Sequence, residues 1–250
     1  MNGHGQQHLP SSRVYDRFHT TIWSLVLSVR DADRAKARQA LETLCGAYWY
    51  PLYAFVRRKR HNPEDAQDLV QGFFALLLER GDLEAVDRAN GKFRSFLMAA
   101  CSHYLANQAD HDRARKRGSG RAPISIDRLK AEGRYDREPA HHLTAERLFE
   151  RQWALTLLDH VLGRLEDEMI RAGKSRSFEA LRPALLGGAE RAPYAQIAAA
   201  LGLSEEATRA AAHRLRRRYR EILREEVGHT LDDPSEVEVE IRTLFSALGG

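Results

Sequence analysis

Hydrophobic side chains recur at three- and four-residue intervals along most of the chain, which is the spacing of one face of an α-helix. This spacing predicts inner helix faces in the stretches 41–55, 66–77, 93–104, 149–165 and 194–222. The short apolar stretch 21–29 fits a helix or a strand equally well. One more amphipathic helix follows Pro234, and its apolar side must pack on another part of the protein. The pattern therefore predicts an all-α fold.

Residues that start and stop helices stand at the ends of these stretches. Asn62, Thr144 and Ser204 each precede a stretch, and their side chains can accept a hydrogen bond from the first helical turn. Gly202 offers the left-handed conformation that ends many helices. Pro51 lies inside the first stretch and lacks a backbone donor, so we expect the helix to kink there or to restart before the basic run 57–60.

A glycine turn joins two of the predicted helices, and this arrangement is typical of a helix-turn-helix. The first helix, from Tyr194 to Leu201, is apolar along one face. The second carries Glu205 and Glu206 in its first turn, where the helix dipole favours negative charge. Its predicted buried stripe consists of Ala207, Ala211, Leu215, Tyr219 and Ile222.

Basic residues fill the side of the second helix opposite that stripe. At about 100° per residue, this side holds Arg209, His213, Arg216, Arg217 and Arg220. No acidic residue lies between Arg209 and Arg220 to offset the charge. Arg214 and Arg218 project nearer to the stripe and must extend outward. A solvated face is the usual interpretation of mixed charges, but an acid-free arginine face on this helix favours DNA reading.

The first half of the chain combines a carboxylate face with aromatic and basic residues. Asp65, Asp68 and Gln71 share the polar side of the helix that begins at Pro63. Because no histidine or third carboxylate joins them, we favour a docking surface for a basic partner helix over a metal site. In the helix after it, aromatic residues lead into a basic end formed by Arg113, Arg115, Lys116 and Arg117. That composition fits a single-strand binder, although core followed by a solvated tail is the commoner case.

Changes in composition divide the 250-residue chain into five parts. Residues 1–13 are polar and predict a disordered arm. Residues 14–117 form the first small helical domain, and residues 144–227 form the second, with the helix-turn-helix. Residues 118–143, with glycine, serine, proline and mixed charge, predict a flexible linker between them. Residues 228–250 form an acidic C-terminal helix.

Composition and charge narrow the class of protein. The chain is 43% hydrophobic and 30% charged with a formal net charge of +4, which predicts compact cores and an anionic partner. Cys45 and Cys101 have no second thiol or histidine at metal-ligand spacing, so we expect buried thiols and neither a metal nor a cofactor. No signal peptide opens the chain, and its longest apolar run is far shorter than the about 20 residues that cross a bilayer. We therefore expect a cytoplasmic protein without membrane insertion.

Two blocks of this sequence resemble the extracytoplasmic-function group of bacterial sigma factors, the small subunits that direct RNA polymerase to promoters. The run from Pro63 to Gln71 looks like the docking helix of conserved region two, although Gly72 stands where the family often has glutamate. The run from Phe93 to Leu97 looks like the next family element, with Phe96 where tryptophan is usual. The helix-turn-helix is similar to conserved region four.

The resemblance implies that the chain binds core RNA polymerase, on the beta-prime clamp helices and the beta subunit, and directs promoter-specific initiation without being an enzyme. It implies that promoter DNA is both recognised and melted. The polymerase-binding residues would be Asp65, Asp68, Leu69 and Gln71. The residues facing the minus-ten element would be Phe96, His103, Asn107, Arg113, Arg115, Lys116 and Arg117. At the minus-thirty-five element, the helix-turn-helix would use Arg209, Ala210, His213, Arg214, Arg216, Arg217 and Arg220.

Two other functions compete with this interpretation. A stand-alone helix-turn-helix regulator would bind an operator without polymerase, and it leaves the carboxylate face unexplained. An enzyme acting on nucleic acid would need clustered carboxylates or an activated nucleophile, and the pairs His111-Asp112 and Asp159-His160 have no partners at a sensible spacing. The sequence leaves open whether an anti-sigma factor or a kinase is a further partner.

The acidic C-terminal helix has two interpretations of equal standing. Residues 232–248 either fold against a basic domain surface and restrain DNA binding until a partner displaces them, or they complete the core of the second domain.

Overall fold

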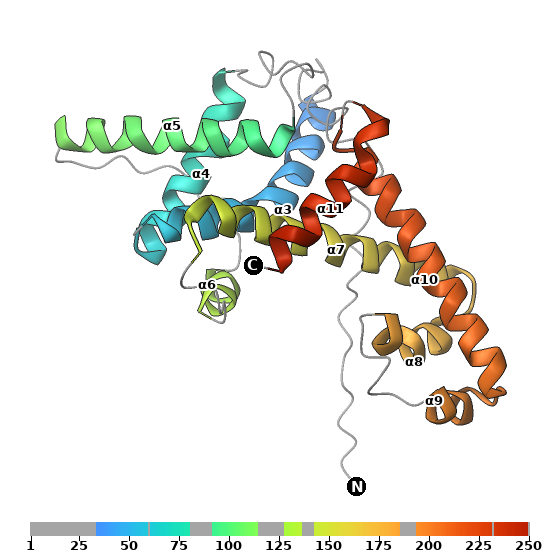
Figure 1. Cartoon of the computed structure of the whole chain (residues 1–250). Helices are drawn as coiled ribbons and strands as arrows, with labels where there is room; N and C mark the ends of the chain where they lie inside the picture. The colour runs from blue at the N-terminus through green and yellow to red at the C-terminus, as the bar shows by residue number, and fades with distance from the viewer. Residues whose placement is uncertain are drawn as a thin grey trace, which may run out of the picture. The chain divides into compact units, whose positions relative to one another are not determined.

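The computed structural model describes residues 34–59, 61–80, 92–114, 128–136, 143–185, 194–231 and 233–249. Every regular element in these ranges is helical, so the expected all-α class is confirmed for the described chain (Figure 1). The predicted arm 1–13 and the apolar stretch 21–29 lie outside these ranges. The elements in chain order are α3 (Arg34–Arg58), α4 (Pro63–Arg80), α5 (Phe93–Ala114), α6 (Arg128–Tyr135), α7 (Ala145–Arg171), α8 (Ser175–Leu185), α9 (Tyr194–Leu201), α10 (Glu205–Gly228), the 3-10 turn η4 (Pro234–Glu236) and α11 (Val237–Leu248).

The chain separates into two compact units. The larger unit combines Arg17–Thr156 with Val227–Gly250, and the smaller unit includes Leu157–Glu226. The chain passes from one unit to the other inside α7 and returns near the end of α10. The predicted domains 14–117 and 144–227 stay a prediction. The first turns of α7 belong to the larger unit because Phe149 packs on Phe55 of α3, with ring centroids 6.4 Å apart. The helix α11 belongs to the larger unit, and it contacts the first half of α7, where Arg151 donates to Leu248 O at 2.8 Å.

Aromatic residues form the core of the larger unit around the second half of α3. Tyr48, Tyr53 and Phe55 of α3 are fully buried, and the ring of Tyr48 meets Phe93 of α5 edge-on at 5.5 Å. Burial on every side is the property of a helix at the centre of a core. It also explains why α3 continues through Pro51 without restarting, because neighbouring residues hold the helix where one backbone donor is missing.

The range expected to be a flexible linker contains α6, which is anchored on α3. Glu132 accepts hydrogen bonds from the hydroxyl of Tyr53 and from Nε and Nη2 of Arg57, the latter two at 3.1 and 2.6 Å. The guanidinium of Arg134 lies 3.9 Å from the ring centre of Tyr50. Burial, with Glu132 beside it, raises the pKa of the Tyr53 phenol. At least this part of the range is therefore bound to the larger unit.

Several local predictions are confirmed. Asn62 Oδ1 accepts from the backbone N–H of Asp65 at 2.7 Å, and Thr144 Oγ1 accepts from Arg147 at 3.2 Å, so both residues cap their helices. The Cys101 thiol is buried, and burial raises its pKa to about 12, whereas the side chain of Cys45 lies outside the described part. Within the described helices, none is long and apolar enough to cross a membrane. The predicted stripes are fully buried in α4, at Ala66, Val70, Phe73 and Leu77, and in α7, at Phe149, Trp153, Leu157, Val161 and Leu165.

Candidate nucleic-acid interface

The turn between α9 and α10 has the geometry that its residues predict. Gly202 has a φ of +67°, and the next N–H, of Leu203, bonds back to Ala198 O at 3.0 Å to close α9. Ser204 then caps α10, because its Oγ accepts from the N–H of Ala207 at 3.1 Å. On the other side of this turn, Arg176 of α8 donates to Ala200 O at 2.7 Å. These bonds fix the direction in which α10 leaves the turn.

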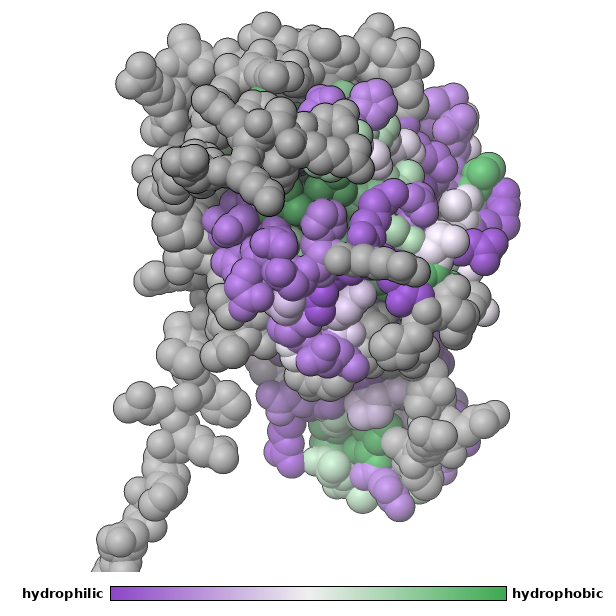
Figure 2. Space-filling model, turned by 90° about the vertical axis from the view of Figure 1, so that its left-hand side faces the viewer, coloured by the Kyte–Doolittle hydropathy of each residue, from purple (hydrophilic) through white to green (hydrophobic). Residues whose placement is uncertain are grey.

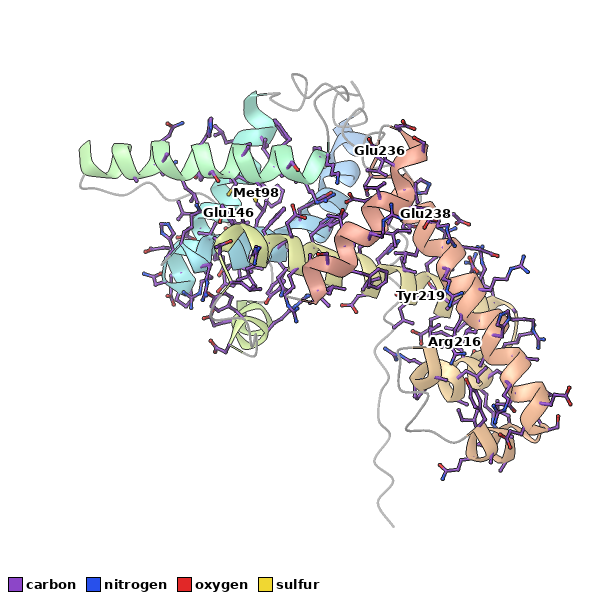
Figure 3. The ribbon with its side chains drawn as sticks, viewed as in Figure 1. Met98, Glu146, Arg216, Tyr219, Glu236 and Glu238 are labelled. Carbon is purple, nitrogen blue, oxygen red and sulfur yellow. The ribbon has the colours of Figure 1, made fainter. Side chains whose placement is uncertain are left out.

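The buried stripe of α10 differs from the predicted one at its N-terminal end. Ala207 and Ala211 are only half-buried, whereas Thr208 and Ala212 are fully buried. The inner side is therefore turned by about 100° from the predicted line in these turns. Tyr219, labelled in Figure 3, is half-buried, and burial raises the pKa of its phenol to about 12. The fully buried residues of this helix are Thr208, Ala212, Leu215, Ile222, Leu223, Glu226 and Val227.

The outer side of α10 is a basic surface, which we call the arginine face. Arg209 and Arg217 keep 62% and 74% of their side chains exposed, although each forms an ion pair one turn away, with Glu205 and Glu221 respectively. Such exposed pairs contribute only about 0.3–0.5 kcal/mol to stability. An anionic ligand can therefore replace the glutamate as the partner of either arginine. The exposed residues of the arginine face are Arg209, Ala210, His213, Arg214, Arg217, Arg220 and Arg224.

Arg216, which was predicted to bind DNA, is only partly exposed and has hydrogen-bond partners within the smaller unit. Its guanidinium donates to the carbonyl of Ala184 at the end of α8, at 3.0 and 3.3 Å, and to the hydroxyl of Tyr194 in α9 at 2.8 Å. Figure 3 labels this side chain in the smaller unit. Arg216 therefore ties α10 to α8 and α9. Arg214, expected near the buried stripe, is instead exposed, as its predicted DNA-facing position requires.

Ion pairs fix α10 on the second half of α7. Arg218 donates from Nε and Nη2 to the two carboxylate oxygens of Glu168, each at 2.8 Å, and this contact lowers the pKa of Glu168. From α7, Arg164 binds Glu225 and Glu226 of α10. Arg218 also approaches Glu225, with 3.3 Å between Nη1 and Oε1. These acidic residues pair with arginines that lie outside the arginine face, which leaves that face predominantly basic.

The predicted polymerase-docking face lies on α4 of the larger unit. Asp65 and Asp68 are exposed, and Leu69 and Gln71 are partly exposed. Asp65 also accepts from the Asn62 side-chain amide at 2.8 Å, so it forms part of the helix start. The face of the molecule in Figure 2 is mostly hydrophilic where its residues are described. Asp68 is therefore the carboxylate on this face that a partner can reach without disturbing the cap.

Three of the predicted minus-ten residues, Phe96, His103 and Asn107, lie along α5. His103 and Asn107 are exposed one turn apart, and Phe96 is partly exposed, with its ring 6.1 Å from that of Phe93. The side chains of Arg113, Arg115, Lys116 and Arg117 lie outside the described part. At the crossing with α4, a Cβ on Gly72 would lie 2.4 Å from Tyr104 Oη. A side chain at position 72 would therefore meet this hydroxyl, and Tyr104 would have to shift to make room for it.

No protein-family model, curated protein or solved structure matches this chain. The interface is therefore defined by its own geometry. Among the described residues, no three histidine, cysteine or acidic side chains gather as they would to hold a metal ion. Of the pair Asp159-His160, Asp159 is exposed, whereas His160 is buried with Nε2 3.5 Å from the carboxylate of Glu226. These two side chains thus lie in different environments.

Sequence reasoning missed a buried ionic cluster in the larger unit. Glu240 of α11 contacts both Lys92 and Arg94 at the start of α5, and Arg94 also binds Glu150 of α7 at 2.7 Å. The acidic character of the C-terminal helix was the only signal for it. The identity of its partners could not be predicted, because Lys92 and Glu240 lie 148 residues apart.

Proposed function

We propose that this protein is a sigma factor that binds core RNA polymerase and directs initiation at specific promoters. The observation that carries the proposal is the arginine face of α10, in which five arginines and one histidine are exposed on one side of a capped helix. The opposite side of α10 is buried against the other helices of the smaller unit. A helix that presents cations on one side and is fixed on the other has the form that docks in a major groove.

In this function, α10 reads the upstream promoter element. Arginines of the arginine face bind guanine edges or phosphates, and each good bidentate base contact discriminates by about 1–3 kcal/mol. Phosphate contacts supply much of the affinity. Because they release counterions, the logarithm of the binding constant falls as the logarithm of the salt concentration rises, by about 0.9 for each phosphate contacted. Arg216 acts differently, because it holds α8 and α9 in the position from which α10 projects.

The larger unit serves docking and melting. Asp68 on α4 meets a basic partner surface on the polymerase, and the surface formed by Phe96, His103 and Asn107 on α5 holds an unpaired base of the minus-ten element. Holding an extruded base offsets an unstacking cost of a few kcal/mol. Basic residues at 113–117 would bind the phosphates of the same strand. The polymerase supplies the chemistry of RNA synthesis.

Transcription from a library of promoter sequences tests this function directly. Core RNA polymerase with the protein should start RNA at a defined subset of sequences, and core enzyme alone should not. Asp68→Asn should reduce this initiation at least severalfold. Glu179→Gln is the matched control, since it removes the same charge from an exposed position on α8 and should have no effect. Failure to bind core enzyme, together with specific duplex binding as a dimer, would favour an operator-binding regulator instead.

Two neighbouring arginines test the role of α10. Arg217→Gln should weaken duplex DNA binding and reduce the salt slope by about 0.9, while leaving thermal stability unchanged. Arg216→Gln should lower the melting temperature of the smaller unit, because it loses the bonds to α8 and α9. Equal loss of DNA binding by two stable variants would contradict this division of roles.

A further inference from the structure

The helix α11 is held on the larger unit by a carboxylate that is almost completely buried. The Glu240 side chain is 1% exposed and contacts Lys92 and Arg94, and the Arg94 side chain is 4% exposed. At the other end of α11, Arg151 of α7 donates to Leu248 O at 2.8 Å. The Glu240 contacts join α11 to the start of α5, and both helices are labelled in Figure 1. Arg94 is therefore covered by the chain's own C-terminal helix, whereas the Lys92 side chain is partly covered and 32% exposed.

Apart from this carboxylate, few residues of α11 are fully buried, although Val237, Ile241 and Leu248 are partly buried. Leu244 is its one fully buried hydrophobic residue, whereas Val239 and Phe245 are 53% and 52% exposed. A buried ion pair adds little net stability, because removing both charges from water costs about as much as their attraction returns. The contact thus fixes where α11 docks more than how strongly it docks. A helix held in this way can leave its site without unfolding the aromatic core.

Departure of α11 would expose a pair of cations at a useful position. Lys92 and Phe96 are four residues apart, so they lie on the same side of the start of α5. Arg94 is stacked on the Trp153 ring, 4.5 Å from its centre, and keeps Glu150 as a second partner. With Glu240 present, the two cations Lys92 and Arg94 face the two carboxylates of Glu240 and Glu150. Without Glu240, one of the two positive charges is uncompensated.

We propose that Glu240 occupies a phosphate-binding site formed by Lys92 and Arg94, and that a backbone phosphate of single-stranded nucleic acid takes its place when α11 leaves. The inference rests on the proposed function in one respect, the assignment of α5 to the melted promoter strand. Lys92 would hold the phosphate beside the base that packs on Phe96, which is the combination of charge and aromatic stacking that single-strand binders use. In the free protein, α11 therefore restrains binding of the melted strand.

The test compares two variants of the full chain that lose the same charge. Glu240→Gln removes the buried carboxylate, and Glu236→Gln removes an exposed one at the start of the same helix (Figure 3). Binding of a labelled mixed-sequence DNA single strand is measured by fluorescence anisotropy over a range of salt. Glu240→Gln should bind about three- to tenfold more tightly at low salt, with a slope steeper by about 0.7 per added phosphate contact. Glu236→Gln should change affinity less than twofold. In the Glu240→Gln background, Lys92→Gln should abolish the gain.

Hydrogen exchange of residues 237–248 provides an independent measurement. These amides should exchange faster in Glu240→Gln than in Glu236→Gln, while the second half of α3 stays protected. A chain ending at Glu236 should fold and show the same increase in single-strand affinity. The proposal is overturned if Glu240→Gln releases α11 without a gain in affinity, if both glutamate variants gain equally, or if neither Glu240→Gln nor the shortened chain folds. A chain that starts no transcription but still shows the Glu240 effect would refute the sigma function and leave this site standing.

Discussion

Gly72→Ala should cost the larger unit up to about 2 kcal/mol, because a new Cβ at the crossing of α4 and α5 would meet the Tyr104 hydroxyl. A Cβ at this position would lie 2.4 Å from Tyr104 Oη and 3.4 Å from its Cζ. Only the first of these distances is a clash, since 3.4 Å is an ordinary contact. The hydroxyl is therefore the atom that decides the outcome, and Tyr104→Phe should relieve the strain. The two substitutions form a double-mutant cycle.

The magnitude follows from two opposing contributions. Alanine in place of glycine inside a helix stabilises by about 1 kcal/mol, and overpacking of a close contact costs about 1–3 kcal/mol. The Tyr104 ring can move away only in part, because it packs on Phe73 at 5.9 Å. We therefore expect Gly72→Ala to cost about 0–2 kcal/mol in the natural chain and to stabilise by about 1 kcal/mol in the Tyr104→Phe background. The coupling energy is then about 1–3 kcal/mol.

Urea unfolding followed by tryptophan fluorescence measures this coupling. Trp49 and Trp153 both lie in the larger unit, so their emission reports the unfolding of the unit that contains the α4–α5 crossing. In all four proteins of the cycle, the free energy of unfolding should fall with urea concentration at the same slope. An equal effect of Gly72→Ala in the two backgrounds would show that the hydroxyl does not limit the approach of the helices.

Three further predictions concern single residues. Because Arg218 lowers the pKa of Glu168, this pair stabilises the folded state above the ordinary glutamate pKa of about 4.3 and loses its effect as the pH falls through the lower folded value. Glu168→Gln should thus lower the free energy of unfolding by about 1 kcal/mol at neutral pH, as followed by circular dichroism. This difference should shrink in acid, and a difference that is constant with pH would contradict the role of the ion pair. Ser204→Ala should cost about 1 kcal/mol through loss of the α10 cap, and Ser204→Asp, which restores a cap acceptor, should recover most of it. In a Cys45→Ser chain, Cys101 should react with a disulfide reagent at mildly alkaline pH at least about 100-fold more slowly than in urea, and rapid labelling of the folded protein would refute its burial.

Features set by neighbours in sequence could be predicted from the sequence. The caps at Asn62 and Ser204 and the stripe of α4 depend on spacings of three and four residues, and each is present in the structure. For the same reason, the exposed positions of His213 and Arg217 could be assigned from helical periodicity. Periodicity was sufficient wherever the partner lies on the same helix or in the adjoining turn.

Features set by distant partners could not be predicted in this way. Arg216 lies near the edge of the arginine face, and only the position of the α8 carbonyl decides that it turns inward. The helix α6 has eight residues and no stripe of its own, since it is held by Tyr53 and Arg57, residues 79 and 75 positions away from Glu132. Its local sequence resembles a linker because most of what stabilises it lies elsewhere.

The insertion of the smaller unit into the larger one has a consequence for folding during synthesis. The larger unit includes α3 near its beginning and α11 at its end, so α11 leaves the ribosome only after residues 157–226 of the smaller unit have been made. Lys92 precedes Glu240 by 148 residues, which at about 5–20 residues per second corresponds to roughly 7–30 s. During that interval Arg94 can already pair with Glu150, 56 residues downstream, while Lys92 awaits its partner. The nascent chain therefore exposes the basic start of α5 before the finished protein covers it.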